Sequence, residues 1–196
     1  GHDGASAASS LFGAGFATQP IEGQERLNPI VTSYYRIVTD SGGPGEFRGG
    51  CGVEKGTRLT DSLGTVMSYC CDRSRSVPRG IGGGLPSSAQ GLWLNPDSSD
   101  TQYLGAVFSN VTLQSGDVIS RPSAGGGGYG DPLNRTTSAV LEDVIDGYVS
   151  RERAAKDYGV IFTDDPEATA GLTVDETATE AERADIRAHR REWPGS

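Results

Sequence analysis

The stretch Ser123-Ala124-Gly125-Gly126-Gly127-Gly128-Tyr129-Gly130-Asp131-Pro132 separates two parts of the chain that differ in character. Short apolar segments and turns precede it, and acidic segments with helical periodicity follow it. Four consecutive glycines add no side chain to a core and lose much backbone entropy on ordering. A folded protein keeps them where φ is positive or where another surface comes very close; a flexible linker is the alternative. Because the run ends at once in Tyr129 and the stiff Asp131-Pro132 pair, we expect an ordered loop in close contact with another segment.

The composition favours a folded protein with many turns. The chain has 196 residues, of which 35% are hydrophobic and 22% charged, which suits one large domain, alone or with an appendage. Its 29 glycines are twice the usual share of roughly 7%. Glycine at this level, spread between short apolar segments, indicates a turn-rich β architecture.

The charge distribution argues against nucleic acid as a partner. The formal net charge is −9, and residues 131–196 hold 15 acidic and 8 basic side chains, so most of the excess lies there. A nucleic-acid-binding protein needs a basic patch or stripe, and the sequence has none. No run of about 18 apolar residues is present either, so we expect no membrane span.

Histidine and cysteine are too few for most metal or nucleophile sites. His2 and His189 are the only histidines, so neither a metal ligand set nor a Ser-His-Asp arrangement is easily built. The three cysteines, Cys51, Cys70 and Cys71, form no disulfide framework. We expect them to be small buried side chains in a reducing compartment, which favours a cytoplasmic location.

The apolar pattern before the glycine run predicts short strands. Residues 31–38 are rich in β-branched and aromatic side chains and carry apolar groups on both faces, so we expect a strand buried on both sides. Interior glycines in residues 46–53 indicate a bulge or a close neighbour. Further strands are expected at residues 64–72, 90–94, 102–109 and 118–121.

After the glycine run, helical spacing dominates. Ser138 can cap a helix whose apolar residues extend to Tyr148. Ser150 can cap a second helix, residues 151–158, which ends at Gly159. A brief strand at residues 160–162 precedes a final helix, which a capping box at residues 177–180 opens.

These elements together predict an α+β fold. It consists of a mostly antiparallel, β-rich domain with glycine-rich loops, followed by acidic carboxyl-terminal helices. The expected division of the chain is an extended amino-terminal arm at residues 1–20, the β-rich domain at residues 21–132 and a helical segment at residues 133–196.

Glycine-rich loops and nearby arginines are the candidate binding or interface residues. They could converge so that backbone N–H groups form a nest for an anion. The alternative is that the loops pack on each other or on another subunit. No catalytic residue can be assigned. The candidates are Arg48, Gly49, Gly50, Arg73, Arg79, Gly82, Gly83, Gly125, Gly126, Gly127, Gly128, Tyr129 and Asp131.

A nucleotide site has little support. Gly125, Gly127 and Gly130 satisfy a G-x-G-x-x-G spacing, but within a run of glycines such a match is near chance. The motif works between a strand and a helix, where the helix end meets a pyrophosphate. Here the anionic Asp131 stands where the phosphate would lie, and no phosphate loop with Lys-Ser/Thr is present.

A family resemblance rests on several segments in combination. They are Pro20-Ile21-Glu22, DSGGPGEFRGGCG at residues 40–52, PRGIGGG at 78–84, the glycine run at 123–132, VLEDV at 140–144, GYVS at 147–150 and YGV at 158–160. With these motifs, from about residue 17 to residue 160, the chain resembles the carboxyl-terminal part of the hydantoinase B/5-oxoprolinase family. That family includes large subunits of acetone- and acetophenone-carboxylase-type enzymes. The acidic tail beyond residue 163 matches none of its motifs.

The resemblance implies a subunit of a heteromeric, ATP-dependent enzyme. In that family a hydantoinase-A-like subunit binds ATP with Mg²⁺ and phosphorylates a carbonyl or enol oxygen, so that a ketone is carboxylated or a cyclic amide hydrolysed. A divalent metal is implied in the amino-terminal portion of the hydantoinase-B-like subunit. We therefore expect this chain to bind none of these cofactors alone. We expect it to act as a small subunit, inactive alone, that completes a larger hydantoinase-B-like partner.

Two other hypotheses need no partner. The first is a free-standing, β-rich module that binds a small anion or sugar without catalysis. The second is a complete small enzyme that uses Asp72 or Asp131 as an acid or base, although single aspartates are too common to be a signal. The resemblance does not separate ketone from cyclic amide substrates.

Overall fold

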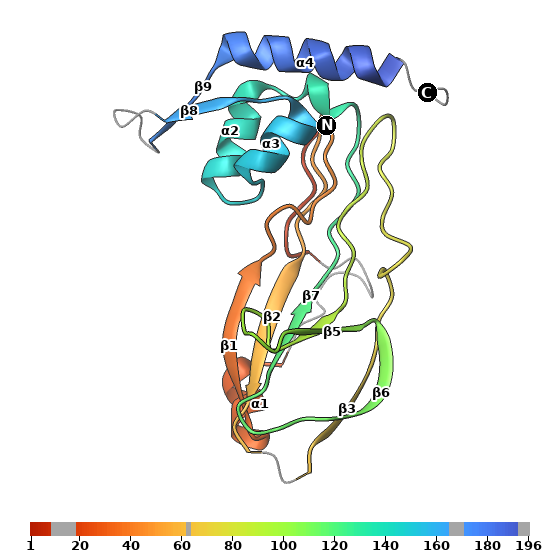
Figure 1. The fold of residues 1–196 in the computed structure, drawn as a ribbon, viewed down its shortest axis with the longest axis vertical. Coiled ribbons are helices and arrows are strands. Elements are labelled where there is room, and N and C mark those ends of the chain that lie inside the picture. The colour runs from red at the N-terminus through yellow and green to blue at the C-terminus, as the bar shows by residue number, and fades with distance from the viewer. Residues whose placement is uncertain (9–18, 62–63, 165–170, 192–196) are drawn as a thin grey trace.

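The computed structural model describes residues 1–8, 19–61, 64–164 and 171–191. Three regions follow one another along its long axis (Figure 1). The strands and short helix of residues 21–122 form one end, the β lobe, and residues 132–191 form the opposite end, the helical lobe. Extended, glycine-rich segments at residues 1–7, 41–52, 78–88 and 123–131 run between them, and we call these the glycine bundle.

An antiparallel five-stranded sheet forms the centre of the β lobe. Its strands, in spatial order, are β1 (Ile30–Ile37), β2 (Val53–Leu59), β7 (Val118–Pro122), β4 (Leu92–Leu94) and β5 (Gln102–Gly105). Strands β3 (Val66–Cys70) and β6 (Val107–Thr112) pair as a separate antiparallel ribbon, and helix α1 (Ile21–Leu27) precedes β1. The buried leucines Leu59, Leu94 and Leu113 form the core between sheet and ribbon, with Met67 and Ile119 packed against them.

The strand expected at residues 31–38 forms, but its predicted burial on both faces is wrong. Strand β1 lies at an edge of the sheet, where β2 is its one partner among the described strands. Its second half is largely exposed, and Tyr35 is 54% accessible. The side-chain pattern predicts a strand, but whether that strand lies at an edge depends on the pairing of distant segments.

The prediction that the cysteines are buried holds for Cys51 alone. Cys51 is buried in the glycine bundle, Cys71 is partly exposed, and Cys70 is exposed on the β3–β6 ribbon. A two-stranded ribbon with one covered face leaves every second side chain in solvent, and Cys70 is one of these.

The helical lobe contains a small apolar core. It is formed by the 3-10 turn η1 (Pro132–Asn134), helices α2 (Thr137–Ile145), α3 (Arg151–Tyr158) and α4 (Glu176–Arg191), and the strand pair β8 (Phe162–Asp164) and β9 (Leu172–Val174). Val140 on α2 packs with Ala154 and Tyr158 on α3 and with Val149 and Val160, which flank α3. Helix α4 lies across the outside of this lobe, at the end of the molecule (Figure 1).

Two of the predicted helix boundaries are confirmed and two are wrong. Ser150 caps α3, and Gly159 ends it with φ of 60°, a left-handed conformation that suits glycine. However, Thr136 rather than Ser138 caps α2, because the Thr136 hydroxyl accepts the Ala139 N–H. Helix α4 begins at Glu176, where Asp175 accepts the Ala178 N–H, and not at the predicted box of residues 177–180.

The strand predicted at residues 160–162 is displaced. Strand β8 runs from Phe162 to Asp164, whereas Val160 is buried in the helical core before the strand begins. Predictions that fall on residues 9–18, 165–170 and 192–196 lie outside the described residues.

The expected α+β class is confirmed, with sheets that are mainly antiparallel. Within the described ranges, no helix is both long and apolar enough to cross a lipid bilayer.

Candidate functional site

Hydrogen bonds between backbone groups link all four segments of the glycine bundle. The Gly43 N–H donates to the Gly126 carbonyl (2.8 Å), and the Gly126 N–H donates to that of Gly50 (2.9 Å). The third segment is tied in through the Gly128 N–H, which donates to the Leu85 carbonyl (3.0 Å). The amino-terminal segment is joined to the bundle by the Gly4 N–H, which donates to the Arg48 carbonyl (2.8 Å). Four stretches far apart in the sequence thus form one hydrogen-bonded unit without regular secondary structure.

Glycine is required here for space. A Cβ at most of these positions would come within 3.0 Å of a backbone atom of a neighbouring segment, a separation that real Cβ atoms almost never show. At Gly127 it would overlap the Arg79 carbonyl, and at Gly49 the Gly126 carbonyl. The expected close-contact loop is therefore confirmed. The crowded positions are Gly4, Gly42, Gly43, Gly45, Gly49, Gly50, Gly52, Gly84, Gly125, Gly127 and Gly128, and none has a positive φ.

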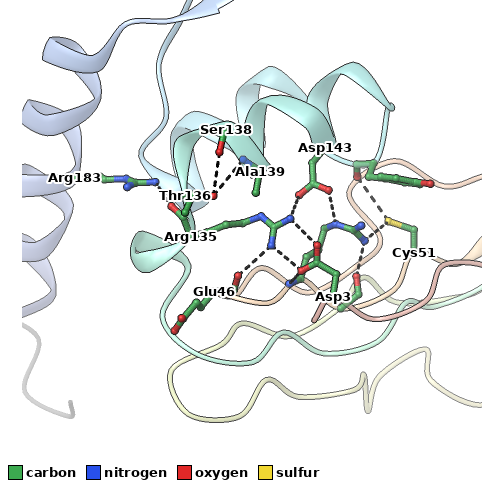
Figure 2. Close-up of polar contacts among 12 residues, drawn as sticks. Asp3, Glu46, Cys51, Arg135, Thr136, Ser138, Ala139, Asp143 and Arg183 are labelled. Atoms are coloured by element: carbon green, nitrogen blue, oxygen red, sulfur yellow. Dashed lines mark hydrogen bonds and ion pairs between the residues drawn. The ribbon is translucent and has the colours of Figure 1, made fainter. Parts of the chain in front are cut away.

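A buried ionic cluster joins the glycine bundle to the helical lobe (Figure 2). Asp143 of α2 lies between two arginines: its Oδ1 is 3.1 Å from Arg48 Nε and its Oδ2 is 2.8 Å from Arg135 Nη2. Arg135 also binds Asp3 with both terminal nitrogens, at 2.7 and 2.8 Å. The Arg48, Arg135 and Asp143 side chains are 5–7% exposed. Three distant parts of the chain therefore meet at one set of opposite charges.

The pKa shifts in this cluster follow burial and charge. Burial raises the pKa of Asp143, although the charges of Arg48 and Arg135 act against this rise. Burial also acts to raise the pKa of Asp3, but the hydrogen bond and charge of Arg135 outweigh it and hold the pKa below its ordinary value. Both carboxylates are paired with arginine, and Asp143 is buried whereas Asp3 is 34% exposed. This geometry suits joining the two regions more than transferring protons to a substrate.

The surroundings of Arg48 fix its position further. Its guanidinium lies over the Tyr148 ring, 4.7 Å from the centroid, and its Nη1 donates to the Gly49 carbonyl (2.8 Å). The same nitrogen lies 3.4 Å from Cys51 Sγ. Arg48 is therefore committed within the fold and is not directed at solvent.

Helix α4 is fastened by arginines that reach the carboxyl-terminal ends of other elements. Arg183 Nε donates to the Tyr158 carbonyl at the end of α3 (3.0 Å), and its Nη2 donates to the Arg135 carbonyl after η1 (2.8 Å). Arg187 Nη2 donates to the Leu133 carbonyl within η1 (3.1 Å). Carbonyls at the ends of helices lack intrahelical hydrogen-bond donors and favour nearby cations. The arginines of α4 supply both the donor and the positive charge.

The predicted site residues do not all converge. Arg48, Gly49, Gly50 and Gly125–Gly128 meet in the bundle, and Asp131 caps η1 by accepting the Leu133 N–H (3.0 Å). Arg73 and Arg79 are exposed and do not join Arg48. The N–H groups of Gly49, Gly126 and Gly128 donate to backbone carbonyls, so these three are not available to an anion. These hydrogen bonds favour the hypothesis that the loops pack on each other over the hypothesis that they form a nest for an anion.

Tyr129 lies with Gly82 and Gly83 at the end of the bundle. Its ring covers Gly82, and both glycines have positive φ, 61° and 96°. Tyr129 is 58% exposed, and its ring centroid is 6.3 Å from that of Phe47. A pocket of about 500 Å³ opens beside Phe47, at the junction between the bundle and the helical lobe. Its lining includes His2, Asp3, Glu46, Phe47, Arg135 and Thr136.

The described residues do not provide a site for the implied divalent metal. Across the ranges described, no group of three or more His, Cys, Asp or Glu side chains gathers in a way that could hold an ion. The carboxylates of Asp3 and Asp143, which meet in the ionic cluster, are bound by arginine. We therefore derive no chemical step through a metal on this chain.

Sequence reasoning missed Asp3, Arg135, Asp143 and Arg183. The local signals that predict the elements around them, namely apolar spacing, caps and turns, do not depend on these four residues. Arg48 and Asp143 are 95 positions apart, so local spacing holds no signal for the pair. One feature could have indicated a buried ion pair: the short, apolar helix α2 has an aspartate, Asp143, among its inward-facing positions, and a buried carboxylate usually has a partner.

A family model, curated relatives and solved structures all match this chain. The family model described as hydantoinase B/oxoprolinase matches residues 1–132. Caprolactamase subunit beta of Pseudomonas jessenii is 33% identical over 179 residues, which cover 88% of this chain and 29% of the relative. The chain therefore spans less than a third of that relative's length.

Two solved structures share the fold. The nucleotide-free structure of acetone carboxylase, from a study of ATP-dependent acetone carboxylation, superposes with a TM-score of 0.84 at 26% identity, over 96% of this chain and 29% of that chain. The ATP-dependent caprolactamase of Pseudomonas jessenii superposes with a TM-score of 0.75 at 29% identity, over 93% of this chain and 32% of that chain.

Proposed function

Because the chain belongs to the hydantoinase B/oxoprolinase family, we propose that it works as part of a heteromeric, ATP-dependent enzyme that acts on a ketone or a cyclic amide. In this enzyme a hydantoinase-A-like subunit supplies ATP binding. Phosphoryl transfer activates a carbonyl or enol oxygen, and carboxylation or ring-opening hydrolysis follows. This chain completes a larger hydantoinase-B-like partner, on which the metal site lies, and it is inactive alone.

The observation that carries the proposal is the likeness to two enzymes with different reactions. An acetone carboxylase forms a carbon–carbon bond and a caprolactamase hydrolyses a lactam, yet nearly the whole of this chain superposes on both. A region common to both enzymes serves what they share, and both are ATP-dependent. This supports a role in building and holding the enzyme's cavity rather than in choosing the substrate.

The ionic cluster and the glycine bundle agree with such a role. Their polar groups are used within the fold, and they hold the two lobes in a fixed relation. A catalytic part needs a group that can reach a reacting atom, whereas Arg48, Arg135 and Asp143 are buried and paired with one another.

The test is purification of the tagged chain from its native cells. We expect it to co-purify with larger polypeptides that include a hydantoinase-B-like and a hydantoinase-A-like chain. The assembly should consume ATP only when a substrate is added, with caprolactam, hydantoin, and acetone plus bicarbonate as the trial compounds. The chain purified alone should show no ATP turnover. Substrate-dependent ATP turnover by the lone chain, or a monomer in native cells, would contradict the proposal.

A further inference from the structure

Three side chains form an exposed apolar row across the end of the glycine bundle. Phe47 and Tyr129 are antiparallel bridge partners, and Ile81 and Tyr129 are parallel bridge partners. Bridge partners on neighbouring extended segments place their side chains on the same face. Tyr129 is 58% exposed, Ile81 is 68% exposed and Phe47 is partly buried. The row is therefore open to solvent in this chain.

The backbone that carries the row is held on both sides. Phe47 and Tyr129 exchange two N–H to carbonyl bonds of 3.0 Å. The Ile81 N–H donates to the Gly128 carbonyl, and the Gly130 N–H donates to the Ile81 carbonyl, both at 2.9 Å. Because the segments are fixed in advance, a partner that covers the row need not order this backbone on binding.

The pocket beside Phe47 adds a charge to this surface. Glu46 lines it, and within the described part of the chain its carboxylate makes no ion pair or hydrogen bond. Asp3 lines the same pocket, but its carboxylate is already paired with Arg135, whose Nη1 also donates to the backbone carbonyl of Glu46 (3.1 Å; Figure 2). A half-buried carboxylate beside an aromatic ring favours a lysine or arginine, whose stem packs on the ring while its charge meets the carboxylate.

The length of the relatives indicates what covers the surface. This chain aligns with 29% of caprolactamase subunit beta, so more than twice its own length of the family fold lies outside it. Glu46, Phe47, Ile81 and Tyr129 all fall in residues 1–132, the part that the family model matches. The surface thus belongs to the shared region of the family and not to the carboxyl-terminal residues beyond it.

We propose that the row and the pocket together dock the polypeptide that carries the remainder of the hydantoinase B fold. An apolar side chain of that polypeptide lies on Phe47, Tyr129 and Ile81, and a lysine or arginine enters the pocket to pair with Glu46. This inference rests on the proposed function, because it places the partner of the proposed assembly on a named surface.

The experiment uses the tagged full chain in native cells. It measures the amount of a hydantoinase-B-type polypeptide, identified by mass spectrometry, that is retained per tagged chain. The test variants are the double change Ile81→Ser with Tyr129→Ser, and Glu46→Gln. The matched controls are Val107→Ser, at a side chain 71% exposed on the β lobe, and Glu142→Gln, at an exposed carboxylate on α2.

We expect the double variant to lower retention about tenfold or more, as truncation of central interface side chains does, and the Val107 control to leave it unchanged. Glu46→Gln should lower retention several-fold and lose its effect at high salt, because the contact is electrostatic. Thermal unfolding of each isolated variant separates a lost contact from a lost fold. If the double variant unfolds, Ile81→Arg, at a single exposed position, replaces it.

The outcomes separate the two proposals. Equal retention by the row variants and the wild type would overturn the docking surface and leave the proposed function standing. Retention of a second copy of this chain, or of a polypeptide outside the family, would overturn the docking surface as stated. If the wild type retained no hydantoinase-B-type polypeptide, both proposals would fall.

Discussion

In the glycine bundle the segments meet backbone against backbone, whereas in the helical lobe side chains separate the elements and fill the space between them. The bundle buries few large side chains, Arg48 among them, and its carbonyls lie where the Cβ atoms of other residues would be. The helical lobe buries Val140, Ala154 and Tyr158, and the two regions meet at opposite charges. One chain therefore has two kinds of interior: the bundle does not tolerate an added atom, and the buried charges where it meets the helical lobe do not tolerate the loss of a partner.

The largest effect is expected from adding one methyl group to the bundle. Gly127→Ala would drive a Cβ into the Arg79 carbonyl, so we expect a loss of at least about 4 kcal/mol or failure to fold. The matched control is Gly126→Ala, where the nearest atom, the Gly50 nitrogen, is 3.4 Å away. Urea unfolding measures both. Equal stability of the two variants would show that the bundle tolerates an added methyl group, because the two adjacent glycines would then be interchangeable.

The next effect is expected from removing a charge where the two regions meet. Asp143→Asn leaves Arg48 without its carboxylate in a buried site, so we expect a loss of about 3 kcal/mol. The control is Asp164→Asn, which breaks an exposed pair with Arg151 and should change stability by less than about 0.5 kcal/mol. Denaturant unfolding measures both variants. A similarly small loss of unfolding free energy for both would show that the buried cluster does not stabilise the fold.

A smaller effect tests the cap of α2 in the helical lobe. Thr136→Ala removes the hydroxyl that accepts the Ala139 N–H, so we expect a loss of about 1 kcal/mol. Ser138→Ala, two positions on, should change the free energy of unfolding by less than about 0.5 kcal/mol. The reverse ranking in thermal unfolding would restore Ser138 as the cap.

The smallest effect concerns acid. The pKa of Asp3 in the folded chain lies below the ordinary value of 3.8, so its pairing with Arg135 stabilises the fold above that value. The contribution is lost as the pH falls through the folded pKa. The difference in unfolding free energy between wild type and Asp3→Asn should therefore be full at about pH 6 and shrink below pH 3.8. A difference that is constant down to about pH 2.5 would show that the charge of Asp3 is not involved.

Features that depend on a few neighbouring residues, such as loops and helix caps, could be predicted from the sequence. The glycine run predicted a close-contact loop because it ends at once in Tyr129 and the stiff Asp131-Pro132 pair, and Ser150 and Gly159 marked α3 because caps act within one turn. It could not decide between Thr136 and Ser138, since both can cap. It also could not place β1 at an edge or pair Arg48 with Asp143. The β1–β2 pairs are 16 to 29 positions apart, from Ile37 with Val53 to Ile30 with Leu59, and Arg48 and Asp143 are 95 apart.

Hydrogen–deuterium exchange of the amides of Gly43, Gly126, Gly128 and Gly130 tests most directly whether glycine backbones form the centre of this molecule. Each of these N–H groups donates to a carbonyl of another segment. We predict protection close to that of global unfolding, at the level of the amides in β2 and α3, although these residues lie in no strand or helix. Exchange as fast as that of an unstructured peptide would contradict the account, because the glycine segments would then be linkers between two separate lobes.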